Sequence, residues 1–237
     1  MILKALYDYY ERCGNLPAPG LEEKEIGFLL VLSKEGRFLR FEDCRMGKNR
    51  AKTFLVKKHV GRSSAVAANY LYDNSTYVLG YADMDKEVEK NKDDDKKLKE
   101  TLTKRDTKEN ECLKAFTDKV NDICQACPNS EDLKAICQFY KQDKTDILNA
   151  ISQDPLWDDI KKNLSKKYST FSFRIEGERK ITAEKRELLQ LDAAEEDNAE
   201  EGLCLITGQH KPIVDTTTAT MIPGSQATAK LAAFQVN

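Results

Sequence analysis

Apolar residues recur along the chain with two different periods, and these periods predict short helices and strands in succession. Apolar side chains at helical spacing over residues 2–12, followed by Gly14, predict an amphipathic helix near the N-terminus. Two apolar runs within residues 26–43, separated by the turn residues 34–36, predict a β-hairpin. Residues 52–57 (KTFLVK) predict a third strand, so we expect a small antiparallel sheet here.

A charged and helical region separates these strands from the later ones. Residues 84–111 hold ten acids and nine bases with few apolar positions. This pattern is typical of a solvated helix or of a poorly ordered surface excursion. Residues 112–167 are expected to be helical, with Ser130 capping one helix and Asp154, before Pro155, opening another.

The last part of the chain returns to strands. Residues 169–177 (STFSFRIEG) alternate with period two and predict a strand, and residues 183–201 predict an acidic helix. The run 203–214 (LCLITGQHKPIV) predicts strand, turn and strand, and residues 220–237 predict a loop that leads into another strand. Because that strand reaches Asn237 without a cap or tail, we expect the N-terminal part of a longer protein.

Helices and strands are segregated along the chain, which predicts an α+β fold. We expect a small antiparallel sheet with hairpins plus a helical, charge-rich insertion. Three regions follow from this: a basic antiparallel sheet region at 1–83, the charged and helical insertion at 84–168, and a third region at 169–237. The strands and the Gly-Ser-Gln loop of the third region are expected to complete an N-terminal domain.

Composition and motifs exclude several classes of function. The net charge is −2, so affinity for a polyanion must come from a local patch. No apolar run approaches the roughly 20 residues that span a bilayer, and no secretory signal is present, so we expect a reduced, cytoplasmic protein. Phosphate-binding loops, nucleophile elbows and zincin motifs are missing, and His59 and His210 are the only histidines. We therefore expect no catalytic residue, no cofactor and no metal.

Seven cysteines are scattered over the chain and do not resemble a disulfide framework. Cys124 and Cys127, in CQAC, have the spacing of half a zinc site, with Cys112 and Cys137 on either side. A second short-spaced pair is missing, so a helical core faced by Cys112, Cys124 and Cys137 is the favoured interpretation. A zinc site is the alternative.

A basic cluster from Arg45 to Arg62 holds seven Lys or Arg residues and no acid. Alternation within residues 52–57 places several of these cations around a short strand, which favours contact with phosphate over an ordinary solvated face. The segment 61–80 (GRSSAVAANYLYDNSTYVLG) then offers neutral hydrogen-bonding groups. Its tyrosines either stack on bases or pack in the core, and its hydrogen-bonding residues are Ser63, Ser64, Asn69 and Asn74.

Four segments resemble one protein family in the order in which they occur. MILKALYDYYER, FLLVLSKEGRF, GRSSAVAANYLYDNSTYVLG and CLITGQHKPI with GSQATAKLAAFQVN are similar to the Csd-type large subunit of the type I-C CRISPR surveillance complex, Cascade. The resemblance spans the chain except for residues 84–111 and the helical middle. Family members are much longer, so their C-terminal domain is expected to be absent here. Ala229 replaces a glycine of the family's last loop and disfavours positive φ there.

The resemblance implies a non-enzymatic subunit that binds double-stranded DNA in the prokaryotic cytoplasm, in antiviral defence. Such a subunit recognises the protospacer-adjacent motif, helps unwind the target and leads to recruitment of a helicase-nuclease, while the crRNA reads the target. The implied partners are target duplex DNA, the crRNA-bound handle-capping and backbone subunits, and the helicase-nuclease, with no membrane. The alternative is a protein and crRNA-handle scaffold without direct motif readout.

The expected DNA-binding residues combine the basic cluster with the family motif. Lys52, Lys57, Lys58 and Arg62 are expected to contact phosphate, and Asn69, Asn74 and Gln226 the motif. The alternative for Asn69 and Asn74 is a structural role as turn and cap residues. The remaining candidates are Ser63, Gly224 and Ser225.

Overall fold

The apolar run FLLVL forms strand β2 (Phe28–Leu32), whose five side chains are all buried. In this computed structural model β2 pairs antiparallel with β3 (Phe38–Asp43) and parallel with β6 (Phe171–Ile175). Strand β6 also pairs antiparallel with the short β5 (Tyr72–Asp73), so the sheet order is β3-β2-β6-β5. A strand that is apolar on both faces is typical of the covered centre of a sheet.

The structure describes residues 2–14, 16–18, 20–47, 49–62, 65–191, 201–204 and 207–212. The chain divides into two compact units. Residues 19–60 with 65–191 form the larger, which we call the sheet unit. Residues 1–18, 61–64 and 192–237 form the other, which we call the terminal unit.

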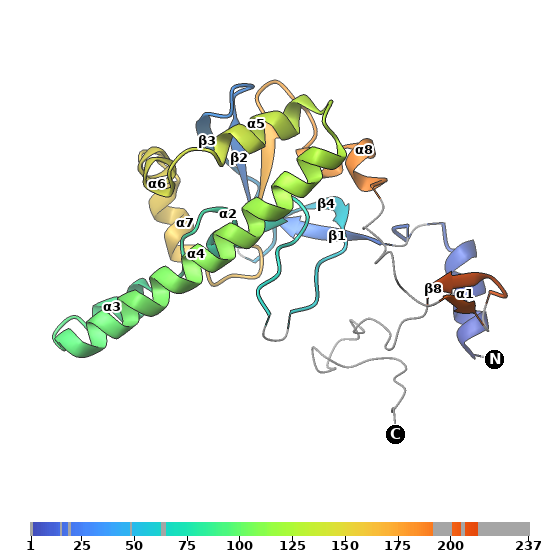
Figure 1. Ribbon diagram of the computed structural model, residues 1–237, viewed down its shortest axis with the longest axis horizontal. Coiled ribbons are helices and arrows are strands. Elements are labelled where there is room, and N and C mark those ends of the chain that lie inside the picture. Colours follow the sequence, from blue (N-terminus) through green and yellow to red (C-terminus); the bar gives the residue numbers. More distant parts are fainter. Residues whose placement is uncertain are drawn as a thin grey trace. The chain divides into compact units, whose positions relative to one another are not determined.

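Helices cover the four-stranded sheet (Figure 1). The longest, α4 (Asp95–Ala126), buries Cys112, Phe116, Val120 and Ile123, which recur at helical spacing along its second half. The Phe116 ring lies 6.2 Å from that of Phe173 in β6. The first part of α4 extends beyond the sheet with α3 beside it (Figure 1). The other helices of this unit are α2 (Ser75–Val78), α3 (Asp85–Lys90), α5 (Glu131–Phe139), α6 (Lys144–Ser152), α7 (Trp157–Asn163), the 3-10 helix η1 (Thr182–Glu184) and α8 (Arg186–Leu189).

Two smaller sheets complete the architecture. In the sheet unit, β1 (Leu21–Ile26) pairs antiparallel with β4 (Lys52–Lys57), and the side chains of Phe54 and Val56 are buried in the common core. In the terminal unit, β7 (Glu201–Leu203) pairs antiparallel with β8 (His210–Pro212). That unit also contains α1 (Ile2–Arg12).

The α+β class is confirmed, and so are the predicted N-terminal helix, the hairpin with its turn at 34–36 and the strands at 52–57 and 169–177. The strand-turn-strand prediction at 203–214 corresponds to β7 and β8, but the first strand lies at 201–203, earlier than predicted. Residues 85–90 and 95–126 are helical, in α3 and α4. The sheet itself is not purely antiparallel, because β2 and β6 run parallel. The three-region division of the chain stays a prediction.

Other local predictions need correction. Helix α7 begins at Trp157, two residues after Pro155, the predicted first helical position. The Asp154 carboxylate still accepts a hydrogen bond from the backbone N–H of Leu156 (2.8 Å), as a helix cap does, and a second one from the backbone N–H of Phe41 (2.7 Å). Asp154 therefore ties the start of this helical turn to the edge strand β3. Within the predicted acidic helix at 183–201, residues 186–189 form the short α8, and 192–200 lie outside the described residues, as do 220–237.

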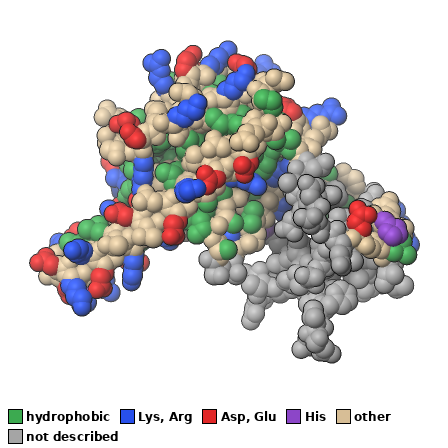
Figure 2. All heavy atoms as spheres, viewed as in Figure 1, with side chains coloured by type: hydrophobic (Ala, Val, Ile, Leu, Met, Phe, Trp, Pro, Cys, Tyr) green, Lys and Arg blue, Asp and Glu red, His purple; other side chains and the backbone are tan. Residues whose placement is uncertain are grey.

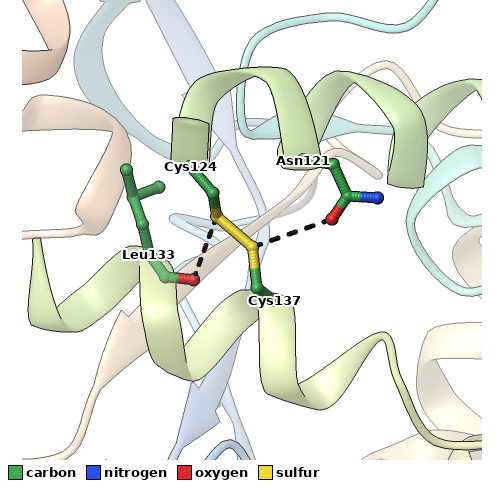
Figure 3. The surroundings of a disulfide bond; sticks show 4 residues. All are labelled: Asn121, Cys124, Leu133 and Cys137. Carbon is green, nitrogen blue, oxygen red and sulfur yellow. Dashed lines mark hydrogen bonds between the residues drawn. A yellow bond between two sulfur atoms is a disulfide. The ribbon is translucent and has the colours of Figure 1, made fainter. Parts of the chain in front are cut away.

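Cys124, near the end of α4, and Cys137, in α5, form a disulfide (Figure 3). The two helices are neighbours, and this brings together cysteines that are 13 residues apart. The expectation of fully reduced cysteines is therefore wrong for this pair. Cys112 is buried in the helical core, as expected, and the described residues contain no group of three or more His, Cys, Asp or Glu side chains that could hold a metal.

Gly36 in the β2–β3 turn provides a test of this packing. Its φ is +78°, and an added Cβ would lie 2.4 Å from Ala135 O and 2.8 Å from Phe139 N, both in α5. We expect Gly36→Ala to lower the free energy of unfolding by about 2–5 kcal/mol, through left-handed backbone strain plus the clash with α5. Urea denaturation measures the change.

The matched control is Gly47→Ala. Gly47 has a similar φ of +75° but nothing within 4 Å of the added Cβ, so only the backbone cost of about 1–2 kcal/mol is expected. Equal losses for the two variants would contradict the packing of the turn against α5.

Candidate nucleic-acid interface

The basic cluster at 45–62 lies on and beside β4, and the fold supplies acids that the local sequence lacks. Strand β1 places three glutamates opposite the basic strand. Arg50 Nε lies 3.2 Å from Glu25 Oε1, and His59 Nδ1 lies 2.7 Å from Glu22 Oε2. The expectation that no acid neutralises the cluster is therefore wrong, since β1 comes from a preceding segment. The three facing pairs are Glu22 with Val56, Glu23 with Leu55 and Glu25 with Thr53.

Arg45 is held within the fold by two carboxylates. Its guanidinium nitrogen Nη2 lies 2.6 Å from Asp43 Oδ2 and 2.5 Å from Asp159 Oδ2. The hydrogen bonds that the Arg45 guanidinium donates to the Asp43 carboxylate raise the pKa of Arg45 and lower the pKa of Asp43. Arg45 therefore joins the end of β3 to α7, and its charge is already paired.

The four predicted phosphate contacts differ in their surroundings. Lys57 is half-buried, its Nζ donates to the carbonyl of Leu191, and the same Nζ lies 5.9 Å from the centroid of the Tyr70 ring. Lys52 is exposed, and its Nζ lies 5.1 Å from the centroid of the Phe54 ring. Lys58 is also exposed. Arg62 belongs to the terminal unit, unlike the three lysines.

Asn69 has a structural role. Its side chain is 9% exposed, its Oδ1 accepts a hydrogen bond from Val60 N at 2.8 Å, and its backbone N donates to Asp73 Oδ2 at 2.9 Å. These bonds join Val60 to the approach to β5. Sequence reasoning left both a recognition and a structural role open, and the amide oxygen serves the structural one.

Asn74 combines a structural oxygen with an exposed nitrogen. Its Oδ1 accepts from Thr76 N at 3.0 Å and caps the N-terminus of α2. The residue is exposed, and in the described part of the chain its carboxamide nitrogen makes no hydrogen bond. The Asn74 side chain is thus held by its oxygen, and its two amide donors have no hydrogen-bond partner among the described residues.

The sequence did not single out Asp73, which fixes this segment. Asp73 is 3% exposed, and its carboxylate accepts from the backbone N–H of Asn69 and of Asn74, each at 2.9 Å. Leu71, two residues earlier, has a φ of 62°, which is uncommon for a residue with a side chain. An Asp directly before an Asn cap is the signal that could have indicated such a turn.

The tyrosines of this segment belong to the fold. Tyr72 and Tyr77 are 0% and 6% exposed, and the Tyr72 hydroxyl lies 2.9 Å from both Glu22 Oε1 and Lys57 O. Burial raises the pKa of the Tyr70 phenol, whose ring packs against the core. Core packing is therefore the correct interpretation for these rings. Ser63, Gly224, Ser225 and Gln226 lie outside the described residues.

The family model described as CRISPR-associated protein (Cas_Csd1) matches residues 6–237. The chain belongs to this family. The Csd1 family is that of the type I-C large subunit. Comparison with curated proteins finds no match. In the described part of this Csd1 chain, no helix has the length and apolar character needed to cross a membrane.

Lys57 and Lys52 are expected to differ in their effect on stability. Lys57→Ala should lower the free energy of unfolding by about 1–3 kcal/mol, because the ammonium group holds the Leu191 carbonyl. Lys52→Ala should change it by no more than about 0.5–1 kcal/mol, because Lys52 is exposed and only its contact with Phe54 is lost. Thermal and urea denaturation measure both, and equal effects would contradict the assignment of Lys57 to the fold.

Proposed function

We propose that this Csd1-family chain is a non-enzymatic, double-stranded-DNA-binding subunit of a crRNA-guided type I-C Cascade complex. In this proposal it recognises the protospacer-adjacent motif, helps unwind target DNA and leads to recruitment of the helicase-nuclease in antiviral defence. Its partners are then the target duplex, the crRNA-bound handle-capping and backbone subunits, and the helicase-nuclease. The family match over residues 6–237 supports the proposal most strongly.

Asn74 is the residue best placed to read a base. Its oxygen is committed to the α2 cap, and the following Ser75–Val78 are buried, so the side chain is held in one orientation. Its exposed amide group can donate to acceptors on base edges, such as purine N7 in the major groove. A donor held in place before binding loses little conformational entropy when it meets its acceptor.

The other candidates take supporting roles. Lys52 and Lys58 are exposed and suit phosphate contact, whereas Lys57 and Asn69 position the segment that leads to Asn74. The remaining proposed contacts come from residues in the terminal unit: Arg62, Ser63, Gly224, Ser225 and Gln226.

A scaffold that holds the crRNA handle without reading the motif is the second candidate. The observation that favours it is the pairing of the basic cluster with acids, which reduces the number of cations available to a duplex. A subunit with few phosphate contacts binds a duplex weakly at physiological salt.

A substitution that keeps the cap but removes the amide separates recognition from folding. Serine caps helices about as well as asparagine, so Asn74→Ser should keep the melting temperature. It should lose about 1–3 kcal/mol of discrimination between motif-containing and scrambled duplexes, because the base-edge donors are gone. The measurement is a pair of titrations with the variant assembled in the crRNA complex, beside a thermal melt.

Asn74→Ala is the matched control, because it removes both the cap and the amide. It should lose the same discrimination and, in addition, about 0.5–2 kcal/mol of stability. Unchanged discrimination in Asn74→Ser would count against motif recognition by Asn74 and would favour the scaffold candidate.

A further inference from the structure

Three segments far apart in the sequence meet at the end of the sheet unit where β2 ends. They are the β2–β3 turn at 33–37, α5 with residues 140–142, and the loop at 176–180 that follows β6. Gln142 Nε2 donates to Gly36 O at 3.1 Å, and the backbone N–H of Glu176 donates to Leu32 O at 2.8 Å. We call the solvent-facing side of these segments the α5 surface.

The α5 surface is rich in unpaired positive charge. Five of its cations are exposed and make no ion pair with any described residue: Lys34, Arg37, Lys141, Arg179 and Lys180. Three of the nearby carboxylates are already paired, in Lys134–Glu131 (3.2 Å), Arg40–Glu176 (3.2 Å) and Lys185–Glu178 (3.4 Å). In these segments and in the adjoining first turn of α6, the exposed carboxylates without an ion pair to a described residue are those of Glu35, Asp143 and Asp146. Positive charge therefore predominates.

The surface is continuous along α5. Positions 131, 134, 138 and 141 recur at helical spacing and are all exposed, while Leu133, Ala135 and Ile136 face the core. Figure 2 shows Lys and Arg side chains gathered along the upper rim of the molecule, where Figure 1 places α5 and the ends of β2 and β3. The charge pattern is thus produced by the fold, because none of the three segments is strongly basic alone.

The chemistry of this surface fits a nucleic-acid backbone better than a protein. The exposed large apolar side chains of the described residues lie outside all three segments, and protein interfaces usually need such anchors. A nine-residue helix is about 13 Å long, and phosphates recur about every 3.4 Å along one strand. The one lysine of α5, Lys134, is paired with Glu131, so the unpaired cations come from the two flanking segments and from Lys141 after the helix. Cations spread over a surface of this length could meet several successive phosphates.

We propose that the α5 surface binds the phosphate backbone of a nucleic acid. This binding site goes beyond the proposed function, because it includes neither the candidate residues beside β4 nor Asn74. The contact is independent of base sequence, since Lys and Arg bind phosphate as charges. It supplies positive charge in addition to that of Lys52 and Lys58 in the cluster at 45–62, in which Arg45 and Arg50 are paired with acids.

The test removes one cation from each segment. The triple variant Arg37→Gln, Lys141→Gln and Lys180→Gln keeps side-chain size and hydrogen bonding while removing three charges. The control, Lys86→Gln, Lys90→Gln and Lys96→Gln, removes three unpaired exposed lysines from α3 and α4. Each purified chain is titrated with a scrambled DNA duplex and, separately, with a single-stranded RNA, over a range of salt concentrations, beside a thermal melt.

The α5-surface variant should flatten the slope of log affinity against log salt by about 2–3 for at least one nucleic acid. The control should keep nearly the slope of the parent chain, and both should melt as the parent does. Equal changes of the salt slope in the two triple variants would overturn the proposal, because the slope would then depend only on the net charge of the chain. An unchanged slope for both nucleic acids would also overturn it.

The outcome is separable from that of the motif proposal. The α5-surface variant should leave the ratio of the affinities for motif-containing and scrambled duplexes unchanged. Asn74→Ser should change that ratio without changing the salt slope. Failure of one result therefore leaves the other intact.

Discussion

The parallel pairing of β2 with β6 is the contact on which the sheet unit depends. It joins residues 28–32 to 171–175 in continuous register, from Phe28 opposite Phe171 to Leu32 opposite Ile175. Parallel neighbours require a long crossover connection, and here the crossover contains β3, β4, β5 and the helices α2 to α7. The helices that cover the sheet are thus part of the connection that makes the pairing possible. The ring of Phe116 in α4 packs against the ring of Phe173 in β6.

Both candidate surfaces derive their geometry from that pairing. Strand β5 pairs with β6, so the turn that holds Asp73 and Asn74 is fixed to the sheet, and the α2 cap then orients the Asn74 amide. At the other end of β6, the chain leaves the sheet beside the β2–β3 turn and brings Arg179 and Lys180 to α5. A change in the register of β2 and β6 would displace both the Asn74 segment and the α5 surface.

Much of the fold was predictable because it depends on local periodicity. The hairpin around 34–36, the strand at 52–57 and the alternating strand at 169–177 each follow from the pattern of their own residues. Strand partners did not, because pairing depends on contacts between distant segments: β4 joins β1 and not the hairpin, and β2 joins β6 in parallel. Asp154 shows the same limit, since the hydrogen bond from Phe41 N–H to its carboxylate joins segments that are 113 residues apart.

In the candidate site, too, features set by the local sequence were predictable and those set by contacts between distant segments were not. The Asn/Tyr segment was found from its residue types. A structural role was kept as the alternative for the asparagines, and core packing as the alternative for the tyrosines. The charge of the basic cluster was misjudged, because the neutralising Glu22 and Glu25 lie some thirty residues earlier and reach it only through β-pairing. For the same reason the cations of the α5 surface could not be grouped from the sequence.

The central claim is that the segment around Asn74 meets the motif of the target duplex. The most direct measurement places a photo-crosslinking amino acid at position 74, in the chain assembled with its crRNA-bound partners, and maps the products on target DNA. The account predicts crosslinks to the duplex at the motif, and their loss on a duplex with a scrambled motif. Crosslinks to the crRNA or to protein subunits alone would contradict it.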